Sequence, residues 1–218
     1  KGNGKVDKCV SVVIPAFNEE KTIEHVINTV KQVSNITEII VVDDGSTDNT
    51  TVMCDILAKK HSAVKVIHKE NGGHGDAVMT GLSHAEGLYF KVVDSDDWVH
   101  PDFLKMLYAA AEETLCKISA CGFFRTEGEE LPQDQDYSIC AMSADDYYCG
   151  ESHGGVTAVA WNKLYHRSLF KKLRSPMGQL HEDEFTTYIA VYQAKKIAVT
   201  TRACLFEFDL KNFSAHAR

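Results

Sequence analysis

The chain has 218 residues, of which 44% are hydrophobic and 25% are charged, so it is long enough to bury one sizeable core. Its 23 basic and 31 acidic residues give a formal charge of −8, which argues against nucleic-acid binding, because that needs a basic face. The overall charge does not exclude a membrane-bound partner, because a local patch can act against it. No apolar run approaches the roughly 18 residues of a membrane span.

The cysteines indicate the cellular compartment of the protein, and the N-terminus indicates where its domain begins. Seven cysteines are scattered along the chain without a CxxC pair. This pattern predicts buried thiols in a reducing cytosol, rather than disulfides or a zinc site. Residues 1–8 begin with the polar run Lys1–Lys5 and show no signal peptide. We expect them to be a disordered or artificially added terminus. A single domain is then expected over residues 9–218.

In the first half of the chain, short apolar runs alternate with stretches of helical periodicity. The first apolar run stops at Pro15, and Ser46 and Asp48 are suited to capping a later helix. The predicted strands are residues 10–14, 39–42, 64–67 and 89–93. Four helices are predicted. The first has an apolar stripe within residues 23–33, the second has one formed by Val52, Met53, Ile56 and Leu57, and the third has one formed by Ala77, Val78, Leu82 and Ala85. The fourth helix is predicted from Pro101 to about Thr114.

The second half is less regular. A strand is predicted over Ile118–Phe124, followed by a polar loop or hairpin tip over Thr126–Gln135, and Trp161–Tyr165 is a further candidate strand. A helix is then expected with an apolar stripe of four residues, Phe185, Tyr188, Ile189 and Tyr192. Two closing strands are expected over residues 197–199 and 204–208.

Alternation of strands and helices, with nearly continuous apolar strands, predicts an α/β fold with a mostly parallel central sheet flanked by helices. Ligands of such sheets bind beyond the carboxyl ends of the strands. Three strand ends carry polar residues, namely 15–19, 43–46 and 94–97. We therefore expect these segments to meet at one edge of the sheet.

The segment Asp94-Ser95-Asp96-Asp97 is the strongest chemical signal. Its carboxylates repel one another and lose solvation when partly buried, and a hard cation such as Mg²⁺ or Mn²⁺ would relieve both costs. The alternative is a solvated turn that caps the following helix. Its position directly after an apolar strand favours the metal site.

The two earlier strand ends supply candidates for a nucleoside. Asp43 and Asp44 can accept hydrogen bonds from a uracil ring or a ribose, whereas Ser46, Thr47 and Asp48 are expected only to cap a helix. Phe17 is placed to stack on a base, although a lone Phe at a strand end is more often a core residue.

Three further segments contain candidate ligands. Asn71–Gly75 precedes a helix, so its backbone N–H groups and His74 can face phosphate, the alternative being a plain turn. His181–Glu184 offers a carboxylate that can act as a general base, although acids at a helix start are common for dipole reasons. Trp161 can pack on a sugar and Lys163 can pair with phosphate, while a core Trp and a Lys with a buried stem are equally compatible.

These segments, in this order, resemble family 2 glycosyltransferases over residues 9 to 209, and are most similar to bacterial enzymes of capsule, cell-wall or exopolysaccharide assembly. The matching motifs are residues 12–19, 41–48, 69–75, 92–98, 161–165 and 181–184. The resemblance implies the GT-A fold and inverting transfer from a nucleotide-diphosphate sugar, most often a UDP-sugar, to a glycan or lipid-linked acceptor. It implies a cytoplasmic enzyme, with peripheral association at the inner face of the membrane, and no nucleic-acid partner.

The resemblance also implies roles for individual residues. Asp183 matches the catalytic base, with Glu182 beside it, and Asp96, with Asp94, matches the metal ligands for Mn²⁺ or Mg²⁺. The acceptor or sugar side would contain Trp161, Lys163 and His181. The nucleotide-sugar donor would contact Pro15, Ala16, Phe17, Glu19, Asp43, Asp44, Gly73, His74, Asp94, Ser95 and Asp96. Residues 9–115 would form the donor half and residues 116–218 the acceptor half.

Departures from the family pattern and two competing functions remain. Met79 stands where relatives often carry Asn, and Ser175 replaces a commoner Phe. Relatives often continue past the end of this chain, so a truncated catalytic domain is expected.

The competing functions are a sugar-nucleotide-binding module without turnover and an aspartate-nucleophile phosphatase. Trp98 stands where the phosphatase motif needs Thr, which disfavours the phosphatase.

Overall fold

The computed structural model describes residues 9–33, 35–99, 102–126, 138–149, 159–174 and 182–208. For residues 98, 123–126, 182 and 201–208 it describes the backbone only. His181, Ser175 and the polar segment after Thr126 therefore lie outside the described side chains.

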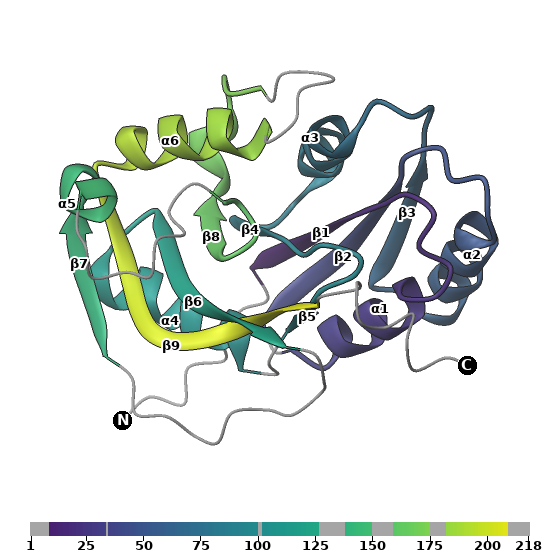
Figure 1. Cartoon of the computed structure of the whole chain (residues 1–218), viewed down its shortest axis with the longest axis horizontal. Coiled ribbons are helices and arrows are strands. Elements are labelled where there is room, and N and C mark those ends of the chain that lie inside the picture. Colours follow the sequence, from purple (N-terminus) through teal and green to yellow (C-terminus); the bar gives the residue numbers. More distant parts are fainter. Residues whose placement is uncertain are drawn as a thin grey trace.

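Strands and helices alternate through the first half of the chain and become less regular in the second (Figure 1). The first half contains β1 (Val10–Ala16), α1 (Ile23–Lys31), β2 (Ile36–Asp43), α2 (Thr50–Lys60), β3 (Val64–His68), α3 (His74–His84), β4 (Tyr89–Val92), β5 (Trp98–Val99) and α4 (Phe103–Thr114). The second half contains β6 (Ile118–Thr126), β7 (Ile139–Ser143), α5 (Ala144–Cys149), β8 (Lys163–His166), the 3₁₀ helix η2 (Arg167–Phe170), α6 (Glu182–Ala194) and β9 (Lys196–Phe208).

The described strands form one nine-stranded sheet in the order β3-β2-β1-β4-β8-β6-β9-β5, with β7 paired to β9. The strands β3, β2, β1 and β4 run parallel, as predicted, and β6 and β9 also pair in parallel. However, β8 runs antiparallel to both of its neighbours, β4 and β6. The parallel first half therefore brings its carboxyl ends to one edge, whereas β8 returns the chain in the opposite direction.

The two faces of the sheet are covered by different helices, as predicted (Figure 1). Residues of α1, α2 and α4 belong to the same core cluster as Ile39 and Val41, while residues of α3, α5 and α6 belong to the cluster that contains Ile40 and Val42. This division follows from the alternation of side chains along a strand. Gly81 lets α3 approach the sheet, because a Cβ atom there would lie 2.4 Å from Val13 Cγ1.

Two helices depart from their predicted apolar stripes, α2 in part and α6 entirely. In α2, Leu57 is buried and Met53 packs against the core as predicted, but Val52 and Ile56 are 57% and 46% exposed and Cys54 is buried. The predicted stripe of α6 (Phe185, Tyr188, Ile189 and Tyr192) is exposed, and Ala190 and Val191 are buried instead. Tyr188 and Tyr192 lie against the ring of Tyr148 from α5.

The closing segment is one long strand, β9, rather than the two predicted strands. Its pairing with β6 shifts register around Gly122, so the two apolar runs belong to one irregular strand.

Of the described cysteines, Cys54, Cys116 and Cys121 are buried as expected, whereas Cys140 and Cys149 are exposed. Among the described residues, no helix is both long and apolar enough to cross a bilayer.

Candidate functional site

The carboxyl ends of β1, β2 and β4 surround a cavity of about 350 Å³, which we call the strand-end cavity. Every residue predicted to contact a donor lines it, except Asp43. Asn71 and Ala77 also line it and were not predicted. The lining residues are Pro15, Ala16, Phe17, Glu19, Asp44, Asn71, Gly73, His74, Ala77, Asp94, Ser95 and Asp96. Asn71 was already part of the glycine-rich motif, so its amide was a detectable signal.

The loops after β1 and β2 are fastened to each other by polar contacts. Asn18 N donates to Ser46 Oγ at 3.0 Å, and Thr47 N donates to Asn18 Oδ1 at 2.8 Å. Asn18 adopts a left-handed conformation (φ 59°), which Asn tolerates better than most residues. Beside these contacts, Phe17 is 47% exposed. Phe17 is therefore not a core residue, and its ring is accessible at the cavity.

Asp44 lines the strand-end cavity and also holds the glycine-rich loop. Its Oδ1 accepts from Lys69 Nζ at 2.5 Å and from Gly72 N at 3.0 Å, and its Oδ2 accepts from Gly73 N at 2.8 Å. Gly73 has φ 87°, a conformation that favours glycine. The carboxylate thus determines the position of the loop that leads into α3 and His74.

Asp43 lies beneath the cavity wall rather than in it. Its carboxylate accepts from Ser46 N at 3.0 Å, from Thr51 Oγ1 at 2.6 Å and from His68 Nδ1 at 2.9 Å. Burial alone would raise the pKa of Asp43, but these hydrogen bonds outweigh it and lower the pKa. Of the three predicted capping residues, only Asp48 contacts the start of α2, where its Oδ1 accepts from Thr50 N at 2.9 Å. The N-cap itself is Asn49, and Ser46 and Thr47 contact Asn18 instead.

Negative charge is concentrated on one wall of the strand-end cavity. Asp94 and Asp96 line that wall, and Asp94 Oδ1 lies 3.2 Å from His74 Nε2. Burial raises the pKa of Glu19, and the charges of Asp96, Asp48 and Asp94 raise it further, against a lowering hydrogen bond from Thr22. A divalent cation would compensate this charge.

The acidic wall is where the expected Mn²⁺ or Mg²⁺ would bind. Within the described ranges, no three His, Cys, Asp or Glu side chains converge as a complete metal-binding set. Two carboxylates, Asp94 and Asp96, do line one cavity. That fits Mg²⁺-type ions bound by one or two carboxylates, with water and substrate phosphates as the other ligands.

Asp183 lies in a second, small and mainly apolar cavity, which we call the Asp183 cavity. His74 lines both this cavity and the strand-end cavity, so the two share a wall. Asp183 Oδ2 accepts from Ala160 N at 3.1 Å, which connects the start of α6 to the turn before β8. Of Glu182 the structure describes only the backbone, at the first position of α6.

Two buried lysines support that turn. Lys163 Nζ donates to Val159 O at 2.7 Å and to Asn162 Oδ1 at 2.8 Å, and Lys91 Nζ donates to Trp161 O. Lys163, which was predicted on the acceptor side, is fully buried and lines neither cavity, because its amine is hydrogen-bonded inside the fold. Trp161 is partly buried against the core and lines neither cavity.

We expect Lys163→Met to remove a pH dependence of stability. Burial, followed by repulsion from Lys91, lowers the pKa of Lys163 to about 7. From that value up to the ordinary lysine pKa, the unfolded chain binds a proton that the native chain does not, so the wild type gains stability as pH rises. Between pH 7 and pH 9, the wild type should gain roughly 1–3 kcal/mol relative to Lys163→Met.

Urea unfolding of both proteins at the two pH values measures this difference. Lys172→Met, which changes an exposed lysine, is the matched control and should change stability in parallel with the wild type. If the free energies of unfolding of wild type and Lys163→Met change equally between the two pH values, the Lys163 amine is not neutral in the native chain.

Known proteins resemble this chain over most of its length. Residues 11–174 match the family model described as "Glycosyl transferase family 2". A putative glycosyltransferase of Bacillus subtilis, EpsH, is 32% identical over 199 residues, covering 87% of this chain and 57% of EpsH. The chain thus spans little more than half the length of that relative.

Solved structures share the fold. Staphylococcus aureus TarS 1–349 in complex with UDP-GlcNAc superposes with a TM-score of 0.77 at 25% identity, covering 92% of this chain and 58% of that chain. A mannosyltransferase from Pyrobaculum calidifontis, solved with GDP-Man and Mn²⁺, superposes with a TM-score of 0.68 at 20% identity, covering 92% and 57%. At that identity, the second match shows the fold alone. Together the superpositions confirm the predicted α/β architecture.

Proposed function

The chain belongs to glycosyltransferase family 2, and on that premise we propose that it is the catalytic domain of an inverting, metal-dependent glycosyltransferase. The donor is a nucleotide-diphosphate sugar, with a UDP-sugar as the first choice, and the acceptor is a hydroxyl of a glycan or lipid-linked molecule. One observation carries the proposal. The strand-end cavity is lined by the exposed ring of Phe17 and by an acidic wall, and it shares His74 with the cavity that contains Asp183.

The donor occupies the strand-end cavity in this proposal. Phe17 stacks on the base, and Asp44 holds the glycine-rich loop whose backbone and His74 face the diphosphate. Asp96 and Asp94 hold the divalent cation, which when bound supplies charge stabilisation for the departing nucleotide diphosphate. Support comes from the UDP-GlcNAc complex of TarS, a protein of the same fold.

Asp183 acts as the base in this proposal. Its carboxylate takes the proton of the acceptor hydroxyl as that oxygen attacks the sugar carbon, in a single displacement that inverts the carbon. The hydrogen bond from Ala160 N orients the carboxylate. The partly apolar surroundings (Val78, Phe90 and Tyr165) reduce competition from water.

The setting of the reaction belongs to the same proposal. It is surface-polysaccharide or cell-wall synthesis in the cytoplasm or at the inner face of its membrane. The division into a donor half (residues 9–115) and an acceptor half (residues 116–218) also stays a prediction.

A thermal-shift screen against UDP-, GDP- and dTDP-sugars with Mn²⁺ tests the donor. A ligand that binds only the folded chain stabilises it, by about 2.7 kcal/mol at a concentration of 100 times Kd. We expect UDP-sugars to raise Tm and the other two classes to do so less. Failure of all three classes to raise Tm would overturn the proposal. Binding with no release of UDP and no transfer would favour the binding module without turnover.

A further inference from the structure

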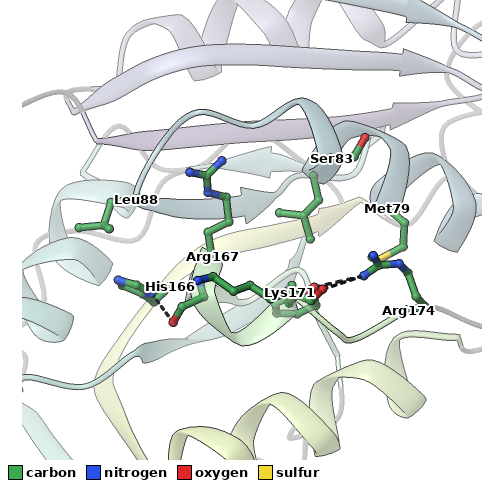
Figure 2. A pocket seen from close by; sticks show the side chains of 10 residues that line it. Met79, Ser83, Leu88, His166, Arg167, Lys171 and Arg174 are labelled. Carbon is green, nitrogen blue, oxygen red and sulfur yellow. Dashed lines mark hydrogen bonds between the residues drawn. The ribbon is translucent and has the colours of Figure 1, made fainter.

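A third cavity, of about 490 Å³, lies between α3 and the segment around η2, and we call it the basic cavity (Figure 2). We propose that it binds the phosphate group of a phosphate-bearing acceptor, an inference that rests on the transferase function proposed above. The side chains that line it are Met79, Leu82, Ser83, Leu88, His166, Arg167, Ser168, Phe170, Lys171 and Arg174.

The charge of this cavity is opposite to that of the chain. Arg167, Lys171 and Arg174 line it, and no Asp or Glu is among the described residues that do so. The chain as a whole carries a formal charge of −8. A local concentration of cations on an acidic protein selects an anion, and guanidinium groups in particular match the oxygens of phosphate.

The arginines are held at the cavity by the backbone. Arg174 donates from one terminal nitrogen to Leu173 O at 2.7 Å and to Phe170 O at 3.3 Å, and Arg167 donates from one terminal nitrogen to Ala85 O. A guanidinium group has five N–H donors, so each arginine retains donors for a ligand. Anchoring reduces the entropy that the side chains lose when they bind an anion.

Lys171 and two hydroxyl groups complete the polar lining. Lys171 is exposed, and within the described part of the chain it forms no ion pair. Ser83 and Ser168 place hydroxyl groups in the lining. His166 is not counted among the cations, because burial and the charges of Lys117 and Arg167 lower its pKa.

The three cavities form a series, and the cavity that contains the candidate base lies in its middle. Met79 and Phe170 line both the basic cavity and the Asp183 cavity, which in turn shares His74 with the strand-end cavity. Figure 2 shows Met79 and Arg174 together at one end of the basic cavity, and Leu88 and His166 at the other. An acceptor whose phosphate lies between Arg174 and Lys171 would therefore extend its hydroxyl past Met79 toward Asp183.

The remaining walls suit an amphiphilic or glycan acceptor. Leu82, Met79 and Phe170 form apolar walls, and Leu88 at the far end is 51% exposed. The phosphate can belong to a soluble glycan phosphate or to a lipid phosphate, and the recognition chemistry is the same for both. The proposal concerns the phosphate group, and two experimental arms separate the sources.

The first arm titrates the chain with inorganic phosphate while UDP and Mg²⁺ fill the strand-end cavity. Chloride at equal ionic strength corrects for screening, and calorimetry reports the affinity. We expect Lys171→Gln/Arg174→Gln to raise the Kd for phosphate about tenfold or more, and Lys171→Gln alone to raise it by a smaller factor. The single variant keeps the backbone contacts of Arg174, so it tests the site even if the double variant folds poorly.

The second arm measures co-sedimentation with vesicles of phosphatidylglycerol and phosphatidylcholine, against vesicles of phosphatidylcholine alone. Binding to the anionic vesicles that the double variant loses assigns the phosphate to a lipid. Phosphate binding without vesicle binding assigns it to a soluble glycan phosphate.

Lys172→Gln is the matched control, because this exposed neighbour does not line the basic cavity and should leave both arms unchanged. No phosphate or vesicle binding by the wild type, or an equal loss in Lys172→Gln, would overturn the inference. UDP binding is measured on the same samples. If UDP binds and phosphate does not, the acceptor site fails alone, whereas absent UDP binding rejects the proposed function itself.

Discussion

Asp183→Asn should slow turnover of the donor sugar by about 100-fold or more, equivalent to roughly 3 kcal/mol or more of transition-state stabilisation, with the donor Kd nearly unchanged. Asn has the size of Asp and keeps an oxygen that can accept the bond from Ala160 N, so the turn before β8 should be preserved. What disappears is the basic oxygen that would take the proton. Release of UDP from a UDP-sugar measures the rate, because water then serves as the acceptor.

Glu184→Gln is the control for this variant. Glu184 is exposed one residue further along α6, and the substitution changes the charge by the same amount. Its rate should stay within about threefold of the wild type, because it lines none of the three cavities. A residual rate of Asp183→Asn close to that of the wild type would place the base elsewhere, and Glu182→Gln would be examined next.

Asp96→Ala should remove the dependence of donor binding on metal. In the wild type, Mn²⁺ should tighten UDP binding by about tenfold or more, or 1.4 kcal/mol, because the cation links the acidic wall to the diphosphate. In the variant, one of the two carboxylates of that wall is missing, so Mn²⁺ should change the Kd by less than about twofold. Calorimetric titration of UDP with Mn²⁺ and with EDTA measures both values.

Asp55→Ala tests whether loss of one negative charge alone explains the effect. Asp55 is exposed on α2, where it pairs with His68, and lies outside the lining of the strand-end cavity. This variant should retain the full effect of Mn²⁺. If the wild type binds UDP equally well with and without Mn²⁺, the proposed metal site is wrong. The same conclusion follows if Mn²⁺ tightens UDP binding as much in Asp96→Ala as in the wild type.

The strand-end cavity was predictable because local sequence and sheet geometry agree there. An apolar run such as Val10–Ala16 is buried on both faces, and parallel strands end at the same edge. The polar residues directly after β1, β2 and β4 therefore had to meet. Asp43 was the exception, because neighbouring carboxylates point to opposite sides and only Asp44 reaches the cavity.

The face of a helix was less predictable than its existence. The spacing of Phe185, Tyr188, Ile189 and Tyr192 correctly indicates α6, but these side chains are exposed and Ala190 faces the core. Apolar periodicity indicates a helix, whereas tertiary packing decides which of its faces is buried. Lys163 shows the same limit, because pairing of β8 with both β4 and β6 turns it inward.

The sequence alone determined the alternating strands and helices of the first half, the acidic segment at residues 94–97 and the order of motifs that identifies the family. Only the tertiary structure decided that the Asp183 cavity shares His74 with the cavity lined by the acidic segment, and that Arg167, Lys171 and Arg174 line a cavity together with residues of α3. The physical reason is the direction of β8. By running antiparallel to β4, it places η2 beside α3, so residues 79–83 and residues 166–174, which are distant in the chain, line one cavity.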